Sequence, residues 1–469
     1  MDGITANTTT ISPRKPRVML YSSPLMGHLV PMIELAKLFA ARGLAITVVL
    51  MDPPYDTGAT GPFLAGVSAA NPSISFHRLP QVKLLESDDS VMPALAFARL
   101  SNPHLRDFLA GASPDFLVVD FFCSAAMDVA SELNIPAYFF STSGAQILAF
   151  FMHLTVLHET TRSFREMGEE LVHVPGITPF PATHSIQPLM DRDGASYQAL
   201  LNVSLNLFRS QGIFINTFRS LEPRAMDTIL AGLSAPAGLS TPPVYCVGPL
   251  VKSEEVDMKR GDECLAWLDT QPKASVVFLC FGSLGRFSAK QTRELATGLE
   301  ASGQRFLWVV RSPPSDDTTE PDLDVLLLKG FLDRTKGRGL VVKSWAPQGD
   351  VLAHHAVGSF VTHCGWNSVL ESTMAGVPML AWPLYAEQKM NAVFLEKEME
   401  LAVVMEGYDK EMVEAKEIAK KVRWMMDSEG GRVLRERTLA VMRQANDALL
   451  EGGESDAAMT GFVDAWVKA

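Results

Sequence analysis

Short apolar runs rich in β-branched residues alternate with longer segments of helical periodicity along most of this chain. The first run spans residues 17–21; an amphipathic pattern follows, Gly43 ends it, and a second run covers 45–51. A strand, a helix and a second strand in this order make a βαβ unit, whose strands pair in parallel. We therefore predict an α/β fold with further strands at 116–120, 137–140 and 212–216.

The same alternation starts afresh in the second half. An apolar run at 275–281 precedes a helical pattern at 288–302 and another run at 305–310. Later strands are predicted at 339–342, 358–362 and 379–381. Because 469 residues exceed what a single hydrophobic core usually organises, we predict two doubly wound, Rossmann-like domains.

The boundaries of these domains follow from local composition. Residues 248–262 are polar, charged and without periodicity, which is typical of a linker. We place one domain at 1–247 and the other at 263–453. Residues 454–469 carry apolar side chains at helical spacing, and we expect a final helix there.

Charge and cysteine content narrow the class of protein. A net charge of −12 argues against a nucleic-acid partner, which would favour a basic surface. The five cysteines have no paired spacing, as expected of free thiols in a reducing compartment. The N-terminus lacks an apolar signal segment, and the longest apolar run is too short to span a bilayer. We expect a cytoplasmic protein without membrane insertion.

The turn after the strand at 358–362 has the features of a phosphate-binding site. Residues 360–368 read as a strand end, a turn containing Gly365 and the start of a helix expected over 369–375. Free N–H groups at a helix start bind phosphate, so the amides of Asn367 and Ser368 and the side chain of His363 could surround a pyrophosphate. An ordinary strand–helix turn, in which Gly and Ser are common, is the alternative.

Three nearby side chains suit other parts of a nucleotide. Glu371 lies one helical step beyond the turn and could accept both hydroxyls of a ribose. Trp345 offers a flat surface for a base, and Gln348 has the donor and acceptor that a uracil edge needs. A solvated helix face for Glu371 and simple core packing for Trp345 are the alternatives.

A histidine and an aspartate at predicted strand ends suggest acid–base chemistry. His28 follows the first strand, at the edge of a parallel sheet where ligands bind in α/β proteins. Asp120 ends the otherwise apolar run at 116–120. If the two strands are neighbours, the carboxylate can orient the imidazole, whose unperturbed pKa of about 6.5 suits a general base. A capping or packed histidine is the alternative for His28 alone.

The stretch from Trp345 to Gln388 closely resembles the donor-binding box of plant UDP-sugar-dependent glycosyltransferases. The resemblance implies the GT-B fold, in which two Rossmann-like domains face each other across a cleft and a C-terminal helix packs back on the first domain. Trp345 and Gln348 match the family's uracil contacts, and Glu371 matches its ribose contact. The family's diphosphate contacts are matched by His363, Asn367 and Ser368. Those that match its sugar-hydroxyl contacts are Trp366, Glu387 and Gln388.

Two positions of this box bear on the sugar. Gln388 resembles members that prefer UDP-glucose, whereas some galactose users carry histidine there. Glu387 is often aspartate in relatives, which keeps the carboxylate but permits a shifted hydroxyl contact. UDP-glucose is therefore the donor we expect.

By this resemblance the chain is an inverting transferase that moves glucose to a hydroxyl of a small apolar acceptor, of the phenolic or flavonoid type. His28 and Asp120 match the family's catalytic dyad. The leaving UDP would be stabilised by His363, by the amides of Asn367 and Ser368, and by Ser283, without a metal ion or other cofactor. Candidate acceptor contacts come from loops of the first domain, and they are Gly27, Phe122 and Thr142. We expect a monomer.

Three other functions stay open from the sequence. A UDP-sugar-binding protein without turnover would keep the box but would have no need for His28 and Asp120. A transferase could use UDP-galactose, or attack from a carbon or nitrogen atom. A nicotinamide-dependent oxidoreductase has the same alternation of strands and helices, but it needs a G-x-G-x-x-G turn after the first strand. This turn is missing here.

Overall fold

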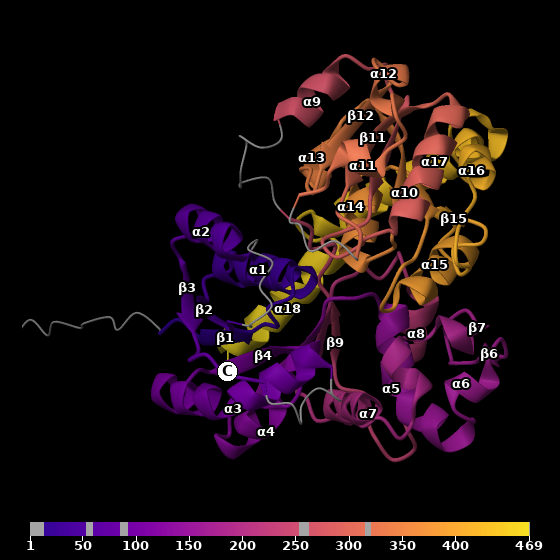
Figure 1. Ribbon diagram of the computed structural model, residues 1–469. Coiled ribbons are helices and arrows are strands. Elements are labelled where there is room, and N and C mark those ends of the chain that lie inside the picture. Colours follow the sequence, from indigo (N-terminus) through magenta and orange to yellow (C-terminus); the bar gives the residue numbers. More distant parts are fainter. Residues whose placement is uncertain (1–13, 53–59, 85–91, 253–261, 315–319, 469) are drawn as a thin grey trace, which may run out of the picture.

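The computed structural model describes residues 14–52, 60–84, 92–252, 262–314 and 320–468. Two parallel sheets dominate it (Figure 1). We call the part built on the first sheet the first lobe and the part built on the second sheet the second lobe.

The first lobe contains a seven-stranded parallel sheet in the order β3-β2-β1-β4-β5-β8-β9. Its strands are β1 (Arg17–Tyr21), β2 (Ala45–Leu50), β3 (Ile74–Arg78), β4 (Phe116–Asp120), β5 (Ala137–Ser141), β8 (Ile213–Ile215) and β9 (Val244–Cys246). Its longer helices are α1 (Met26–Ala41), α2 (Thr60–Ala70), α3 (Pro93–Ala112), α4 (Ala126–Glu132), α5 (Ala145–Thr160), α7 (Ala195–Leu207) and α8 (Pro223–Leu230). A short antiparallel pair, β6 (Leu171–Val172) and β7 (Phe180–Pro181), lies beside α6 (Phe164–Met167).

The second lobe contains a six-stranded parallel sheet in the order β12-β11-β10-β13-β14-β15. Its strands are β10 (Val276–Cys280), β11 (Arg305–Val310), β12 (Gly339–Lys343), β13 (Val357–Thr362), β14 (Met379–Ala381) and β15 (Ala402–Val404). Its helices are α9 (Asp262–Asp269), α10 (Ala289–Ser302), α11 (Leu323–Leu326), α12 (Phe331–Arg334), α13 (Gln348–Ala353), α14 (Trp366–Ala375), α15 (Gln388–Lys397), α16 (Ala415–Asp427) and α17 (Glu429–Leu449).

Both sheets reverse their strand order at one point. In the first sheet the reversal lies between β1 and β4, and in the second it lies between β10 and β13. The helices that follow the two strands at such a point lie on opposite faces of the sheet. A crevice therefore opens at the carboxyl ends of these strands, and α/β proteins bind ligands there. The two halves therefore each present a crevice.

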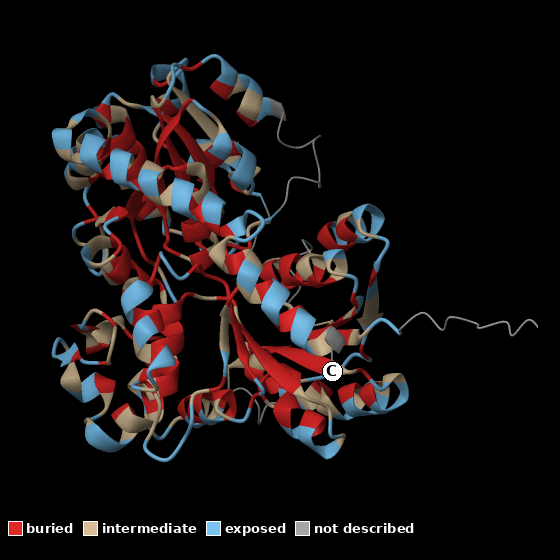
Figure 2. Ribbon diagram, turned by 180° about the vertical axis from the view of Figure 1, so that it is seen from behind, coloured by how far each residue is buried: buried red, intermediate tan, exposed pale blue. Residues whose placement is uncertain are grey.

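The central strands are buried on both faces. Every residue of β4, β10 and β13 is buried, as expected of parallel strands covered by helices on either side. Figure 2 shows the central strands of both sheets in the buried colour, with exposed residues on the outer faces of the helices and in the loops. Hydrophobic burial of this kind is the main stabilising contribution in each lobe.

The C-terminal helix α18 (Glu454–Lys468) runs from the second lobe back across the first (Figure 1). Phe462, only 3% exposed, packs edge-on against Phe116, Phe214 and Tyr138. Trp466 donates its indole N–H to the Tyr138 hydroxyl at 3.1 Å, and Arg42 pairs with Asp456. The last helix of the chain thus completes the core of the first lobe.

The α/β fold with two parallel sheets is confirmed, while several predicted boundaries are wrong by a few residues. The helix expected over 369–375 begins at Trp366, whereas the final helix begins at Glu454, where it was predicted. Of the predicted linker, residues 253–261 lie outside the described residues, and the division at 247, 262 and 453 stays a prediction. The strands β3, β9 and β15 were not predicted.

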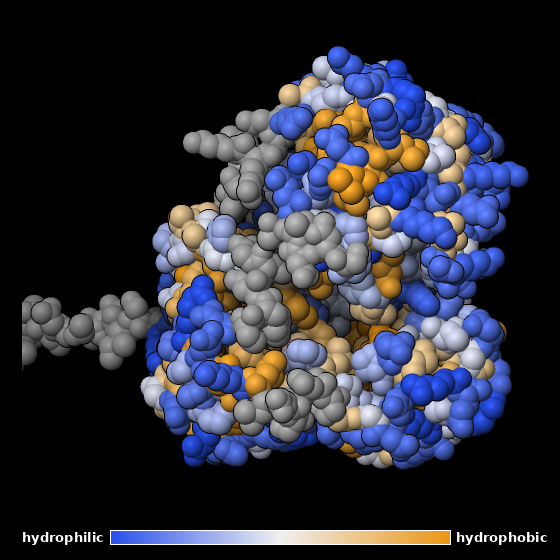
Figure 3. Space-filling view, in the orientation of Figure 1, coloured by the Kyte–Doolittle hydropathy of each residue, from blue (hydrophilic) through white to orange (hydrophobic). Residues whose placement is uncertain are grey.

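The surface is mainly hydrophilic in the view of Figure 3, with apolar side chains gathered over α11 of the second lobe, where Val325 is 63% exposed. Among the residues that the structure describes, no helix combines the length and apolar character needed to cross a bilayer.

We predict that Phe462→Ala lowers the free energy of unfolding by about 3–5 kcal/mol, because it leaves a cavity among aromatic rings. Urea unfolding would measure the loss, with hydrogen exchange of the β1 and β4 amides reporting on the first lobe. Ala465→Ser, on the exposed side of α18, is the control, with a change below about 0.5 kcal/mol. Equal stability of the two variants would contradict the role given to Phe462.

Candidate functional site

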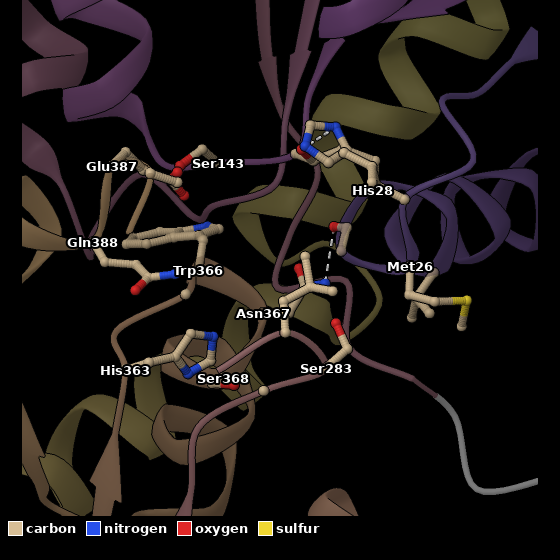
Figure 4. Close-up of a pocket in the computed structure, with 18 of the residues that line it drawn as sticks. Met26, His28, Ser143, Ser283, His363, Trp366, Asn367, Ser368, Glu387 and Gln388 are labelled. Carbon is tan, nitrogen blue, oxygen red and sulfur yellow. Dashed lines mark hydrogen bonds between the residues drawn. The ribbon is translucent and has the colours of Figure 1, made fainter. Parts of the chain in front are cut away.

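A cavity of about 660 Å³ lies between the two lobes and is lined by the carboxyl ends of both sheets. Loops after β1, β4 and β5 contribute from one side, and loops after β10, β11, β12, β13 and β14 contribute from the other. Figure 4 shows His28, Ser283, His363 and Asn367 around this space. His28 and Trp345 therefore open onto the same cavity.

His28 and Asp120 form a hydrogen-bonded pair at the strand reversal of the first sheet. Strands β1 and β4 are neighbours, so the residues that follow them are brought together. The His28 Nδ1 atom lies 2.6 Å from Oδ2 of Asp120, which is fully buried. Because an ionised carboxylate only accepts, Nδ1 carries the hydrogen and Nε2 keeps its lone pair. The Asp120 Oδ1 atom accepts from the Phe122 amide at 3.0 Å, which fixes the carboxylate.

The surroundings of His28 change its proton affinity in two directions. Burial lowers the pKa of the imidazole, but the charge of Asp120, its hydrogen bond and the more distant charge of Glu387 raise it by more. The net pKa lies above the ordinary value of 6.5. The imidazolium that forms when His28 takes a proton is therefore stabilised by its partner.

The residues expected to hold a nucleoside lie together in the second lobe, where two of them already bind each other. Trp345 is 40% exposed beside the cavity. Gln348 donates its amide to Ser368 Oγ at 2.9 Å and to Glu371 Oε2 at 2.5 Å. Burial raises the pKa of the Glu371 carboxyl, against the opposing effects of Gln348 and Lys252.

His363 is held against two glycines at the end of β13. A Cβ atom at Gly282, where φ is +73°, would lie 2.6 Å from His363 Nε2, and one at Gly365 would lie 2.5 Å from it. Only residues without a side chain fit this close approach. Burial lowers the pKa of His363 to about 4, so the ring is neutral at pH 7. Its Nδ1 atom is buried and has no hydrogen-bond partner among the described residues.

The start of α14 joins the two lobes. Trp366, 5% exposed, donates its indole N–H to the carbonyl of Asn216 at 2.7 Å, and the Asn367 amide donates to the carbonyl of Gly27 at 3.0 Å. The Trp366 ring also packs on Gly144, where a Cβ atom would lie 2.7 Å from Cη2. The indole N–H of Trp366 is thus bound across the interface, which leaves its backbone N–H, at the first position of α14, for the expected contact with a sugar hydroxyl; that contact stays a prediction.

A buried carboxylate fixes the first-lobe side of this contact. Glu222, 1% exposed, accepts from the amides of Ala145 and Gln146 at 2.9 and 3.0 Å and from Thr217 Oγ1 at 2.6 Å. These bonds satisfy the free N–H groups at the start of α5. They hold Gly144 where Trp366 packs on it.

The remaining donor candidates lie at the ends of β10 and β14. Ser283 is exposed in the turn after β10. Gln388, 3% exposed, accepts from the amides of Leu384 and Tyr385 at 2.9 Å each, and its side chain also interacts with that of Tyr385. Burial raises the pKa of the Glu387 carboxyl, although His28 opposes the shift.

The candidate acceptor contacts surround His28. The Thr142 hydroxyl lies 3.2 Å from His28 Nδ1, and the Phe122 ring centroid lies 4.7 Å from that of His28. Gly27 lines the cavity beside them. Apolar side chains that the sequence did not single out individually extend this wall, and they include Met92, Leu148, Phe151, Ile186 and Leu200.

Several lining residues were missed from the sequence. Lys252 precedes the undescribed part of the predicted linker, Arg311 follows β11, and Tyr385 lies two residues before Glu387. The position of Arg311 directly after an apolar strand is the same signal that singled out Asp120. It was available in the sequence and was not used.

Comparisons with known proteins agree on one family. The family model described as "UDP-glucoronosyl and UDP-glucosyl transferase" matches residues 254–428. The chain is similar to phloretin 2'-O-glucosyltransferase of Malus domestica, at 44% identity over 95% of this chain and 98% of that protein. It is also similar to anthocyanidin 5,3-O-glucosyltransferase of a Rosa hybrid cultivar, at 43% identity over 96% and 98%.

A solved structure extends the similarity to three dimensions. The structure of Phytolacca americana UGT2 complexed with UDP-2fluoro-glucose and pterostilbene matches with a TM-score of 0.87 and 38% identity. The match covers 96% of this chain and 99% of that one. The two chains therefore share their fold over nearly their whole length.

We predict that Trp366→Phe lowers the free energy of unfolding by about 1–3 kcal/mol, because the buried carbonyl of Asn216 loses its donor. Thermal or urea unfolding of the ligand-free protein would measure this. Trp345→Phe makes the same chemical change on a more exposed indole and should cost less than about 0.5 kcal/mol. Similar losses in both variants would mean that the hydrogen bond to Asn216 does not hold the lobes.

Proposed function

This chain is a member of the UDP-glycosyltransferase family, and on that basis we propose that it transfers glucose from UDP-glucose to a hydroxyl of a small phenolic acceptor of the flavonoid type. The observation that supports this most directly is the His28–Asp120 pair, whose imidazole opens onto the same cavity as Trp345, Glu371 and the start of α14. The proposed general base and the proposed nucleotide site thus line the same cavity.

The proposed reaction is a direct displacement. The acceptor hydroxyl gives its proton to His28 Nε2 as its oxygen attacks the anomeric carbon. The bond from that carbon to the β-phosphate oxygen breaks, and its electron pair leaves with UDP. Attack opposite to the leaving group inverts the anomeric centre. Asp120 keeps the ring oriented and stabilises the imidazolium.

The departing diphosphate would be bound by neutral donors of the second lobe. The amides at the start of α14, Ser283 Oγ and the His363 ring are candidates, since the buried His363 Nδ1 lacks a partner among the described residues. We propose that no metal ion or other cofactor is needed. Full activity after dialysis against a chelator would support this, and loss that Mg²⁺ restores would refute it.

Glucose is the proposed sugar because of Glu387 and Gln388. The Gln388 oxygen is bound to the backbone, so its side-chain nitrogen is the atom that can donate to a hydroxyl that Glu387 accepts from. A competition between UDP-glucose and UDP-galactose tests this choice. Faster transfer from UDP-galactose would overturn it.

The apolar wall around His28 supports a planar aromatic acceptor. Phe122, Phe151 and Leu148 would cover the faces of such a ring while one hydroxyl reaches Nε2. The relatives named for phloretin and anthocyanidin, and the pterostilbene complex, concern acceptors of this phenolic class. A monomeric state and a cytoplasmic location stay predictions, and sedimentation of the purified protein tests the first.

The primary experiment is incubation of the protein with UDP-glucose and a panel of phenolics, read by mass spectrometry as the gain of one hexose. NMR of the product gives the anomeric configuration and shows whether oxygen, carbon or nitrogen is substituted. UDP binding without product from any acceptor would favour the alternative of a non-catalytic binding protein.

We predict that His28→Ala lowers kcat by about 10²–10⁴-fold, because the general base is lost. The affinity for UDP, measured by calorimetry, should stay within about twofold, since the nucleotide site belongs to the second lobe. His173→Ala, an exposed histidine of the first lobe, is the matched control and should keep full activity. Unchanged turnover by His28→Ala would remove the assigned base.

The pH profile of kcat/KM provides a separate prediction. His28 acts as a base only when neutral, and its pKa is raised, so kcat/KM should rise with pH through an apparent pKa above 6.5. Asp120→Asn removes the charge that raises this pKa, so the rise should move to lower pH and the plateau should fall. A profile that Asp120→Asn does not move would show that another group titrates.

A further inference from the structure

Arg311 lies at the carboxyl end of β11, between the two ends of the proposed nucleotide site. Strand β11 pairs with β10 on one side and β12 on the other. The residues that follow these neighbours are Gly282 and Ser283 in one case and Ser344 and Trp345 in the other. All of them line the cavity together with Arg311.

The Arg311 side chain is partly buried and has no anionic partner among the described residues. No hydrogen bond or ion pair joins it to any other residue of the described ranges. Burial lowers its pKa, with the nearby Arg286 adding to the effect against Cys280 and Tyr385. Removing an unpaired cation from water is unfavourable. An anion that enters the cavity would therefore stabilise the charged form of Arg311.

Few charged side chains line the cavity. Among the described lining residues, Lys252 and Arg311 are the lysine and arginine side chains, and Glu371 and Glu387 are the carboxylates. Lys252 is exposed, with its Nζ 6.0 Å from the centroid of the Phe63 ring in the first lobe, and its charge acts on Glu371. His363 is neutral and supplies no charge. A diphosphate would therefore meet little positive charge in the second lobe without Arg311.

We propose that Arg311 binds the diphosphate of the UDP-sugar and of the released UDP, supplying the positive charge that the neutral donors of α14 and His363 lack. This inference rests on the proposed function, and it adds a residue outside the Trp345–Gln388 box to the donor site. A guanidinium suits the task because it stays charged and offers several N–H donors to phosphate oxygens.

The choice of substitution must separate charge from packing. Arg311 also borders a small void lined by Phe281, Phe287 and Trp308, so its stem contributes packing. Arg311→Met keeps an unbranched stem and removes the charge, whereas Arg311→Lys keeps a charge. Arg286→Met is the matched control, because Arg286 is exposed and close enough to affect Arg311, yet does not line the cavity.

Calorimetric titration with UDP and with uridine measures the effect of each variant. We expect Arg311→Met to weaken UDP binding by about 10–100-fold, the size of a lost charged hydrogen bond, and uridine binding by less than about twofold. Arg311→Lys should lie between wild type and Arg311→Met for UDP. Arg286→Met should change both affinities by less than about twofold, because an exposed charge is screened.

Equal losses for UDP and uridine in Arg311→Met would overturn the inference, since Arg311 would then act on the base or on the fold. No loss for either ligand would overturn it as well. Uridine binding retained by the variant shows that the second lobe is folded, and Arg311→Lys gives the same comparison if Arg311→Met is unstable. A wild-type protein that binds no UDP or transfers no glucose would instead refute the proposed function.

Discussion

The contact between Trp366 and Asn216 is the interaction on which the site depends. Each lobe supplies half of the chemistry, since His28 and Asp120 come from the first and the nucleotide residues from the second. Neither half can act unless the two sheets face each other at a fixed distance. The indole hydrogen bond of 2.7 Å fixes that distance beside the cavity. The indole ring packs on Gly144, whose position is held by the bonds of Glu222. The neighbouring bond from Asn367 to Gly27 ties the start of α14 to the turn that carries His28.

Burial then decides which groups carry charge in this space. The same desolvation that raises the pKa of Glu371 and Glu387 lowers that of His363 to about 4. Of the two histidines that line the cavity, His28 has its pKa raised, because a buried carboxylate lies against its Nδ1 atom. The surroundings of the two histidines thus give them different states: His28 can take a proton, and the His363 ring stays neutral.

Much of this could be predicted from the sequence because apolar strands and the residues at their ends are local signals, whereas the pairing of β1 with β4 was only assumed. Apolar runs such as 116–120 predicted parallel strands, and their terminal residues predicted which side chains would gather at one edge. Contacts between distant segments could not be predicted in this way. Nothing in the local pattern indicates that the Trp366 N–H is bound to Asn216, 150 positions earlier, or that Gln348 is engaged with Glu371. The start of α14 was also misplaced, because its N-cap residue Gly365 has no capping side chain.

The path of α18 has a consequence for how the protein is made. Phe462 fills an aromatic cluster whose other members, including Phe39, Phe116 and Phe214, are synthesised hundreds of residues earlier. While the ribosome is still translating the second half, those rings lack their cover and remain open to water or to other chains. The first half therefore cannot reach its final packing until α18 has been synthesised, so its core is completed only after the second lobe has been translated.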